Sequence, residues 1–500
     1  MPGESPTKWQ AHAYRFGVRR LESAVSSGDP LLRGDPVRRR LNLALIISIV
    51  LAALILGGFA VYGFVRPEPS IGDAAVVVDT DTGGAFVSRD GRLYPAMNYA
   101  SALLAAGRGQ SGDKAPSVAQ VNDDAVGREA RGPLLGIPGA PNVLPSPAHL
   151  LDPLWTVCDD TTVDTSLPPG SKPTVTTTAV LGEPAPTFGQ LGTSGMLVSA
   201  DGGRTTYLLW TGGRSKIDLG DNTIRLAFDL RSDVQPRPIS AALLDVIPQN
   251  KDIVAPAIDT SAPTPPYART LGVQVGEVFG LQRADRSTTT YVALPDGVQP
   301  VNPLVGDLIR DQFDQNKQLP LVAPELLRDA PRADAIDQTI YPAVRPQILD
   351  YRQDPVACVY RARSDAGTTR VYALEKLPLP AGAEPVTVTK PGALTVDSVY
   401  LAPGKGAVLA ATTDRQTAGA RPLYVVTDDG VAYPVVSGLA LTYLGYTGND
   451  VSATAPELLN LLPKGPALDP DQAVHFYPQT GVSARSLPSP PAAASSSPAG

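Results

Sequence analysis

One long uncharged stretch constrains this chain more than any other feature. Residues Leu41 to Val65 hold no charged side chain in 25 positions. About 20 apolar residues at about 1.5 Å per residue cross a hydrocarbon core of about 30 Å, so we expect one transmembrane helix. A cleaved signal peptide is disfavoured, because its apolar core spans only about 7–15 residues and Phe64 here runs into Arg66-Pro67. A buried core helix of this length is uncommon.

Positive charge is distributed unequally around this segment. Eight basic residues precede it, and only Arg66 and Arg89 occur in the 25 residues that follow. Basic residues beside a span resist translocation, so we expect the first 40 residues in the cytoplasm and the remainder outside. Eight basic and four acidic side chains give those 40 residues a net charge of +4, which leaves −11 for the rest of a chain with formal charge −7.

The N-terminal arm has the pattern of an amphipathic basic helix. Apolar residues recur at near-helical spacing from Trp9 to Val25, with arginines between them. Such a helix either lies in the headgroup plane or packs on a cytoplasmic partner. A Gly/Pro-bounded break is expected at residues 28–36. The candidate partner-binding residues are Trp9, Arg15, Phe16, Arg19, Arg20 and Leu21.

Length and composition bound the outer body. Five hundred residues exceed what one compact core usually fills, so several folding units are expected. A hydrophobic content of 43% favours packed structure, while 46 Gly and 51 Pro indicate a loop-rich fold. The acidic balance excludes a nucleic-acid binder held by phosphate contacts.

Only two cysteines occur, Cys158 and Cys358, and both lie in the expected outer body. Two thiols in an oxidising compartment favour one disulfide, with two separate buried thiols as the alternative. A zinc site is implausible, because His12, His149 and His475 are few and scattered.

The dipeptide Asp-Gly occurs four times, each behind an apolar or aromatic run. This is a strong hairpin signal, because glycine accepts the positive φ that the turn needs. A second element recurs behind each turn, beginning at Leu134, Leu243, Ala323 and Ala455, and a helix between the two is expected where Asn302 can cap and Pro303 can start it. We therefore expect four degenerate hairpin-helix modules, with repeat turns at Asp90, Gly91, Asp201, Gly202, Asp296, Gly297, Asp429 and Gly430.

These patterns together predict an α+β, multidomain chain with an elongated outer body. We expect a pseudo-two-fold axis to relate modules one and two to modules three and four. The strand-prone segments around the two cysteines are expected to be cross-linked in a central β-rich domain. No structure is assigned to Gly107 to Arg131. The expected parts are an arm (1–40), a transmembrane helix (41–65), module 1 (66–145), the central domain (146–190 and 336–415), module 2 (191–260), module 3 (261–335), module 4 (416–481) and a Pro/Ser/Ala tail (482–500).

The sequence offers little for catalysis. No phosphate-binding loop of the P-loop type is present, and Gly192 to Met196 lacks the last glycine of a serine-hydrolase elbow. The carboxylate pairs Asp159-Asp160 and Asp428-Asp429 are interpreted as turn residues. A weak calcium-loop pattern runs through Asp79, Asp81, Gly84 and Asp90, but glycine occupies its fifth position and aspartate its twelfth. We expect no cofactor and no metal.

Separated motifs, in order, resemble EccB, the single-pass membrane subunit of the actinobacterial type VII secretion system. The resemblance covers nearly the whole chain up to Gly481. The motifs are Gln10 to Arg20, Leu21-Glu22, Asp35-Pro36, Arg66-Pro67, Gly91 to Pro95, Gly136 to Pro141, Trp155 to Cys158 and Leu461 to Leu468.

The resemblance implies a core component of the inner-membrane secretion complex. Implied partners are the ATPase EccC, the channel-like EccD, EccE and other copies of the outer body. Members of the family have been assigned ATPase activity, although no nucleotide-binding motif is recognisable in this sequence. Two classes of function therefore stay open: a structural subunit, and an ATPase or envelope-acting hydrolase within the same complex.

Overall fold

The computed structural model divides into two units, residues 1–70 and residues 71–500, which are described separately. The tail expected at residues 482–500 lies outside the described residues, as does most of the break expected at 28–36. The structure describes residues 7–27, 36–65, 71–109, 112–163, 166, 172–261, 263–283, 285–315, 318–362, 369–388, 392, 394–412 and 421–477.

The first unit consists of two helices, α1 (Lys8–Ser27) and α2 (Pro36–Val65). α2 begins before the uncharged stretch, because Pro36 suits the first helical position, where its missing N–H costs no hydrogen bond. Its segment Leu41–Phe59 is long and apolar enough to cross a membrane, and none of it is buried. The expected long apolar helix is therefore present.

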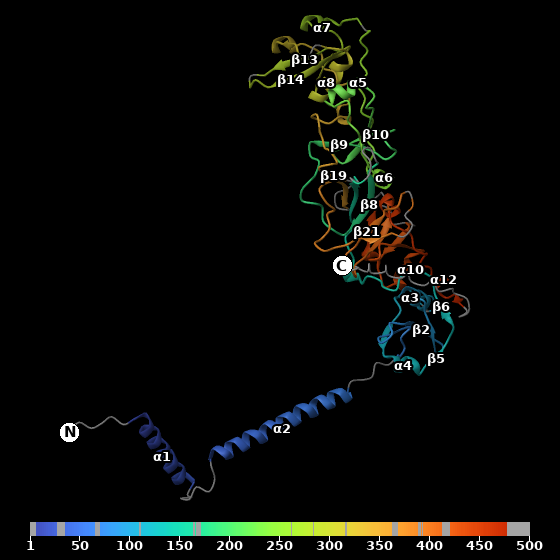
Figure 1. Cartoon of the computed structure of the whole chain (residues 1–500). Helices are drawn as coiled ribbons and strands as arrows, with labels where there is room; N and C mark the ends of the chain where they lie inside the picture. The colour runs from blue at the N-terminus through green and yellow to red at the C-terminus, as the bar shows by residue number, and fades with distance from the viewer. Residues whose placement is uncertain are drawn as a thin grey trace, which may run out of the picture. The chain divides into compact units, whose positions relative to one another are not determined.

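The second unit contains a central sheet flanked by smaller sheets (Figure 1). The central sheet has the strand order β19-β18-β7-β8-β21-β20. Its strands come from two distant parts of the chain. They are β7 (Leu154–Thr162), β8 (Thr174–Leu181), β18 (Val356–Ala362), β19 (Thr369–Leu374), β20 (Val386–Thr387) and β21 (Ser398–Tyr400).

Sheet I is the first small sheet, with the order β4-β1-β2-β3-β5. β1, β2 and β3 form an antiparallel meander, helix α3 follows, and β4 returns parallel to β1. Asn98 caps α3 by accepting a hydrogen bond from the Ser101 amide at 2.9 Å. The elements are β1 (Val76–Asp79), β2 (Ala85–Arg89), β3 (Arg92–Pro95), α3 (Tyr99–Arg108), β4 (Val118–Val121), α4 (Asp123–Gly127) and β5 (Ala130–Arg131).

The expectation of an unstructured loop from Gly107 to Arg131 is wrong, because this range contains the end of α3 and all of β4, α4 and β5. β4 is an edge strand in which only Val121 is fully buried, so its sequence carries almost no apolar alternation. Short edge strands need few buried side chains, and polar composition is then a poor guide to order.

Sheet II has the order β11-β10-β9-β12, with β17 also paired to β9. β9, β10 and β11 form the meander, α5 follows, and β12 returns parallel to β9. β17 joins the same strand from a remote part of the chain. The elements are β9 (Ser194–Ser199), β10 (Thr206–Trp210), β11 (Gly213–Ile217), α5 (Asn222–Ala227), β12 (Arg237–Pro238), α6 (Ala241–Val246) and β17 (Gln347–Ile348).

Sheet III has the order β15-β14-β13-β16 and is preceded by helix α7 (Pro266–Leu271). The expected helix after Asn302 is present: Asn302 accepts from the Val305 amide at 2.8 Å, and Pro303 is the first helical residue. β16 returns parallel to β13. The elements are β13 (Val278–Gln282), β14 (Thr288–Leu294), β15 (Gly297–Val301), α8 (Pro303–Gln312), β16 (Leu321–Val322) and α9 (Pro324–Leu327).

Sheet IV has the order β24-β23-β22-β25, with β25 parallel to β22. Its first strand lies inside the range that the sequence assigned to the central domain. A two-stranded sheet of β6 (Leu134–Leu135) and β26 (Phe476–Tyr477) joins the C-terminal segment to the residues behind sheet I. The elements of sheet IV are β22 (Ala407–Ala411), β23 (Leu423–Val426), β24 (Ala432–Val435), α10 (Gly438–Tyr443), β25 (Val451–Thr454), α11 (Pro456–Asn460) and α12 (Pro470–Ala473).

The small sheets share their cores in two pairs. Sheets I and IV contribute to one apolar cluster, in which α3 packs against α10, and sheets II and III contribute to another, in which α5 packs against α8. A third cluster covers one face of the central sheet with apolar residues of α6 and α11, among them Leu243, Leu458 and Leu459. Sheets I and IV, which lie far apart in the sequence, are thus joined in one core, whereas sheets II and III follow each other along the chain.

Candidate functional site

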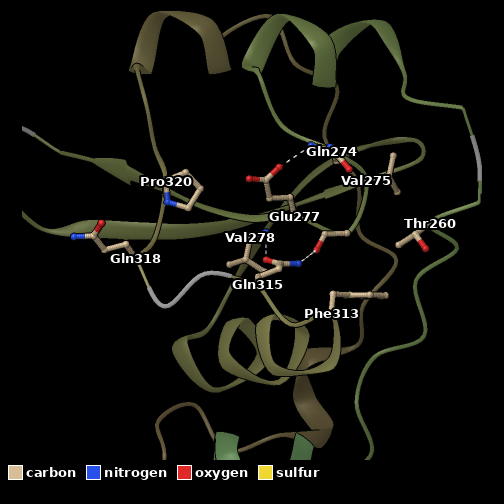
Figure 2. A pocket seen from close by; sticks show the side chains of 10 residues that line it. Thr260, Gln274, Val275, Glu277, Val278, Phe313, Gln315, Gln318 and Pro320 are labelled. Atoms are coloured by element: carbon tan, nitrogen blue, oxygen red, sulfur yellow. Dashed lines mark hydrogen bonds between the residues drawn. The ribbon is translucent and has the colours of Figure 1, made fainter.

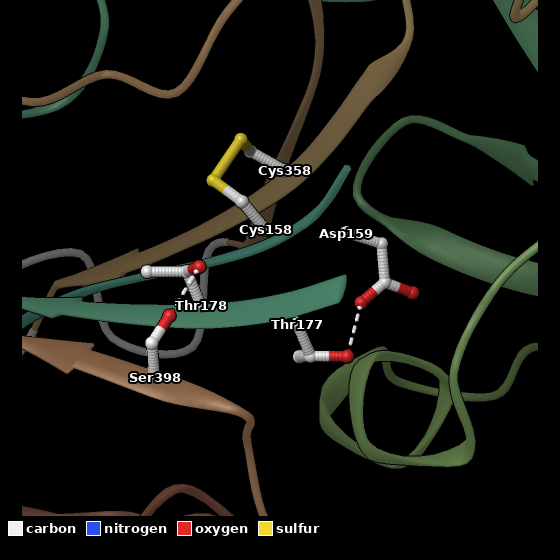
Figure 3. The surroundings of a disulfide bond; sticks show 6 residues. All are labelled: Cys158, Asp159, Thr177, Thr178, Cys358 and Ser398. Carbon is white, nitrogen blue, oxygen red and sulfur yellow. Dashed lines mark hydrogen bonds between the residues drawn. A yellow bond between two sulfur atoms is a disulfide. The ribbon is translucent and has the colours of Figure 1, made fainter. Parts of the chain in front are cut away.

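The two cysteines form a disulfide at the middle of the central sheet (Figure 3). β7 and β18 run antiparallel with Cys158 directly opposite Cys358, and their Cα atoms lie 4.1 Å apart. Both cysteines are fully buried in a small cluster with Tyr360 and Tyr372. The expected disulfide is therefore present, and it closes a sequence separation of 200 residues.

The carboxylate of Asp159 is buried beside this disulfide, in strand β7 (Figure 3). Thr177 Oγ1 on β8 donates to Asp159 Oδ1 at 2.7 Å. At the start of α6, the Ser240 amide donates to Oδ2 at 2.6 Å, and Ser240 Oγ donates to Oδ1 at 3.0 Å. The interpretation of Asp159-Asp160 as turn residues is wrong, because both residues lie inside strand β7.

Burial raises the pKa of Asp159 to about 6, against the lowering effect of the hydrogen bonds from Ser240 and Thr177 and of the Arg237 charge. Arg237 itself lies on β12 and is only 4% exposed. It donates to Met196 Sδ at 3.2 Å and to the Asp354 carbonyl. Burial lowers the pKa of Arg237 to about 10, so this guanidinium stays charged at neutral pH. Sequence analysis placed Asp159 in a turn and did not single out Arg237, because no local pattern indicates which residues the fold brings around either side chain.

Two connecting segments cross between the halves of the chain. Residues 142–153 lead from sheet I to the central sheet and run beside β22 of sheet IV, where the Leu151 amide donates to the Gly406 carbonyl at 2.8 Å. Residues 342–355 lead from sheet III and run beside β9 of sheet II, where the Leu349 amide donates to the Gly195 carbonyl at 2.9 Å. The segment that leaves sheet I is therefore bonded to sheet IV, and the segment that leaves sheet III is bonded to sheet II.

Prolines on these connectors pack on the two glycines. A Cβ added to Gly406 would lie 2.7 Å from the Pro145 side chain, and one added to Gly195 would lie 3.3 Å from Pro346. Tyr446 OH of the segment behind α10 also donates to the Pro145 carbonyl at 2.7 Å. The absence of a side chain at both glycines lets each connector approach its strand.

The four Asp-Gly pairs all lie between antiparallel strands, but their turns differ. Asp90-Gly91 forms the two-residue turn between β2 and β3, with φ values of 51° and 68°. Asp296 is the second loop residue between β14 and β15, and Gly297 already pairs with Leu294. The pair Asp429-Gly430 lies in a longer loop between β23 and β24.

Asp201-Gly202 departs from the expected equivalence. It connects β9 to β10, the first pair of its meander, whereas the other three pairs connect the second and third strands. The corresponding turn of sheet II is Thr211-Gly212, with φ values of 42° and 81°. The Asp201 carboxylate caps its own loop, and the hydrogen bond from the Thr205 amide is the largest cause that lowers its pKa to about 2.

The second recurring element also differs in one copy. Three of the four copies lie at a short helix: Leu243 is in α6, and Ala323 and Ala455 directly precede α9 and α11. In each of these sheets the short helix follows the strand that runs parallel to the first strand of the sheet. Leu134 instead begins β6, and the short helix at the corresponding place in sheet I is α4.

The candidate arm residues lie on α1, where most side chains are exposed. Trp9 is 86% exposed, Phe16 69% and Leu21 68%. Large apolar side chains exposed in this way are typical of surfaces that another molecule or a membrane covers.

The weak calcium pattern forms a turn of its own. Asp79 accepts hydrogen bonds from the Asp81 amide at 2.9 Å and from the Thr82 hydroxyl, and Asp81 accepts from the Asp123 amide at 3.0 Å. These carboxylates therefore bond to protein donors. Among the described residues, no group of three or more His, Cys, Asp or Glu side chains is placed to hold a metal ion.

A pocket of about 550 Å³ lies on sheet III (Figure 2). Two of its polar side chains form hydrogen bonds with the backbone of the pocket itself. Gln315 accepts from the Val278 amide at 3.0 Å and donates to the Gly276 carbonyl at 2.6 Å, and Glu277 accepts from the Gln274 amide at 2.8 Å. No nucleophile paired with a general base lines it. Its lining residues are Thr260, Gln274, Val275, Gly276, Glu277, Val278, Phe313, Gln315, Gln318 and Pro320.

The family described as "Type VII secretion system ESX-1, transport TM domain B" matches residues 4–477. The chain belongs to the EccB family. The ESX-2 secretion system ATPase EccB2 of Mycobacterium tuberculosis is 32% identical over 490 residues, which cover 95% of each chain. The ESX-5 secretion system ATPase EccB5 of the same species is 30% identical over 477 residues, which cover 92% of each chain.

Solved structures of EccB chains are similar over most of their length. A chain of the intact ESX-5 inner membrane complex has a TM-score of 0.69 and 26% identity, and the match covers 98% of this chain and 99% of that one. The EccB3 dimer from the ESX-3 core complex has a TM-score of 0.66 and 27% identity, with 80% of this chain and 100% of that one covered.

Proposed function

We propose that this EccB-family chain is a structural core subunit of a type VII secretion complex in the inner membrane. The observation that carries the proposal is the near full-length similarity to a chain of the ESX-5 inner membrane complex, with 98% of this chain covered. The expected partners are the other subunits of the system, EccC, EccD and EccE, and further copies of the chain itself. The EccB3 dimer supports the self-association.

The proposed orientation places residues 1–40 in the cytoplasm and residues 71–500 outside. The excess of basic residues before Leu41 supports it, because such residues resist translocation. The disulfide supports it independently, because disulfides persist in oxidising compartments outside the cytoplasm.

The outer body is proposed to be four repeats around a pseudo-two-fold axis. Each of sheets I to IV is a three-stranded meander followed by a helix, a strand parallel to the first and a short helix, which supports the repeats. The axis would pass through the disulfide, relating β7 to β18 and β8 to β19. The matched connectors, with Pro145 on Gly406 and Pro346 on Gly195, support this relation.

Helix α1 is proposed to bind the cytoplasmic or membrane-embedded parts of the complex through its exposed apolar side chains. We expect Trp9→Ala, Phe16→Ala and Leu21→Ala, combined in the full chain, to reduce co-purification of the other subunits from detergent-solubilised membranes at least tenfold. Gln10→Ala with Glu22→Ala, at exposed polar positions of the same helix, is the matched control and should leave co-purification unchanged. Equal recovery with both variants would contradict the assignment.

The enzyme alternative has its own test, because curated relatives bear the name ATPase. We expect the full chain, purified away from the other subunits, to show no ATP turnover above that of an identically purified vector control. Turnover that stays with the chain through successive columns, and that a single carboxylate substitution abolishes, would favour the enzyme instead.

A further inference from the structure

A buried carboxylate lies at the junction between sheet II and the central sheet, and the structural role proposed above makes no use of it. Asp159 on β7 is fully buried, and its hydrogen bonds join three elements: β7 itself, β8 through Thr177, and the start of α6 through Ser240. Ser240 also caps α6, because its Oγ accepts from the Leu243 amide at 2.9 Å. The carboxylate therefore fixes the helix that covers this face of the central sheet.

Charged groups from several neighbouring segments lie around Asp159, and in the part of the chain that the structure describes Arg237 is the cation that acts on it. Arg237 on β12 attracts the carboxylate, while Asp160 on β7 and Asp350 and Asp354 on the connector before β18 attract Arg237 in turn. Asp397 before β21 accepts from the Thr177 amide at 2.7 Å. Arg237 is thus shared among several carboxylates, which leaves the charge of Asp159 only partly balanced.

The surroundings of Asp159 suit both of its protonation states. An ionised carboxylate accepts all three of the observed hydrogen bonds. A protonated carboxyl needs an acceptor for its own proton, and the hydroxyls of Thr177 and Ser240 can each accept as well as donate. The junction can therefore gain or lose this proton without a large rearrangement.

We propose that Asp159 makes the docking of sheet II on the central sheet dependent on pH, so that α6 is held more tightly in mild acid than at neutral or alkaline pH. The sign follows from linkage. Burial raises the pKa of the docked carboxyl to about 6, whereas an undocked and solvated Asp159 returns towards 3.8. Docking then takes up a proton between these two values, and a rise in pH through this range favours opening.

A second helix, α11, packs beside α6 on the same face of the central sheet but is attached differently. Helix α11 of sheet IV is joined to β18 by an ion pair, with Arg361 Nη1 2.8 Å from Glu457 Oε1, and each side chain is partly exposed. This junction contains a cation and an anion in direct contact instead of one carboxylate with a shared cation. The proposal therefore applies to the junction of sheet II alone.

The test is hydrogen exchange of the full chain in detergent at pH 5.0 and pH 7.5, corrected for the intrinsic rate at each pH. Between these values the two pKa values predict about a tenfold rise in the opening equilibrium of α6. Peptides covering α6 should show this loss of protection, and peptides covering α3, which packs against α10 and α12, should not. A change below about twofold in α6 would overturn the proposal.

Two substitutions compare Asp159 with an exposed carboxylate outside this cluster. Asp159→Asn keeps the shape but cannot ionise, so α6 should lose its pH dependence. Asp252→Asn, at an exposed position in the segment that follows α6, is the matched control and should keep the tenfold change. If the asparagine at position 159 leaves the dependence intact, another group is responsible and the proposal is wrong. Should that variant fail to fold, the wild-type comparison of α6 with α3 still decides.

Discussion

The two helices of sheet I each contain a glycine near the C-terminal end, Gly107 in α3 and Gly127 in α4, and the surroundings of these glycines differ. A Cβ on Gly107 of α3 would lie 2.2 Å from the ring of Tyr443 on α10, whereas one on Gly127 of α4 would meet nothing within 4 Å. Tyr443 is buried, so its ring has little room to move. At Gly107, helix α3 therefore lies in close contact with α10.

We expect Gly107→Ala to destabilise residues 71–477, expressed without the membrane helix, by about 1–3 kcal/mol, because crowding against Tyr443 exceeds the gain in helix propensity of about 1 kcal/mol. The matched control Gly127→Ala gains the same propensity without a clash and should be neutral or slightly stabilising. Urea unfolding midpoints measure both. Equal midpoints for the two variants would show that the α3–α10 contact is loose.

Single residues also show where sequence reasoning reached its limit. The cysteines could be paired in advance because the chain has only two and both lie beyond the membrane segment. Asp159 could not be assigned, because aspartate is uncommon in strands and common in turns, and only the tertiary fold brings Thr177 and Ser240 to it.

At the scale of elements, the ion pair between Arg361 and Glu457 should hold α11 on the central sheet. Both side chains are partly buried, at 20% and 31% exposed, so solvent screens the pair only in part. We expect Arg361→Met and Glu457→Gln each to destabilise the body, with a coupling free energy of about 1 kcal/mol in a double-mutant cycle. A coupling near zero would mean that apolar packing of α11 is sufficient.

The recurring elements could be predicted only where local chemistry is strong. Asn302-Pro303 correctly predicts the start of α8, because capping and the first-turn proline are local effects. In sheet II the Asp-Gly pair lies in the first hairpin, between β9 and β10, whereas the second hairpin turns at Thr211-Gly212, where Thr211 adopts the positive φ that glycine or aspartate usually supplies. The strands β12, β16 and β17 have two residues each, too short for any periodicity to indicate them.

At the scale of the whole molecule, the disulfide joins two halves that also exchange connectors. In the chain-entropy model, closing a loop of this length stabilises the fold by about 5 kcal/mol. We expect Cys158→Ala with Cys358→Ala to lower the unfolding free energy of residues 71–477 by up to that amount. The segment that leaves sheet I is bonded to sheet IV, and the segment that leaves sheet III is bonded to sheet II. Unfolding should therefore remain a single cooperative transition. Separate transitions for the two ends would contradict this coupling.

The most direct test of the central claim, that this chain is a core subunit of the secretion complex, is the fate of that complex in cells lacking it. Membranes of the deletion strain and of the strain complemented with the full chain are solubilised in mild detergent and compared on native gels probed for another subunit. The account predicts that the large complex disappears on deletion and returns on complementation. A complex of unchanged size and abundance in the deletion strain would contradict it.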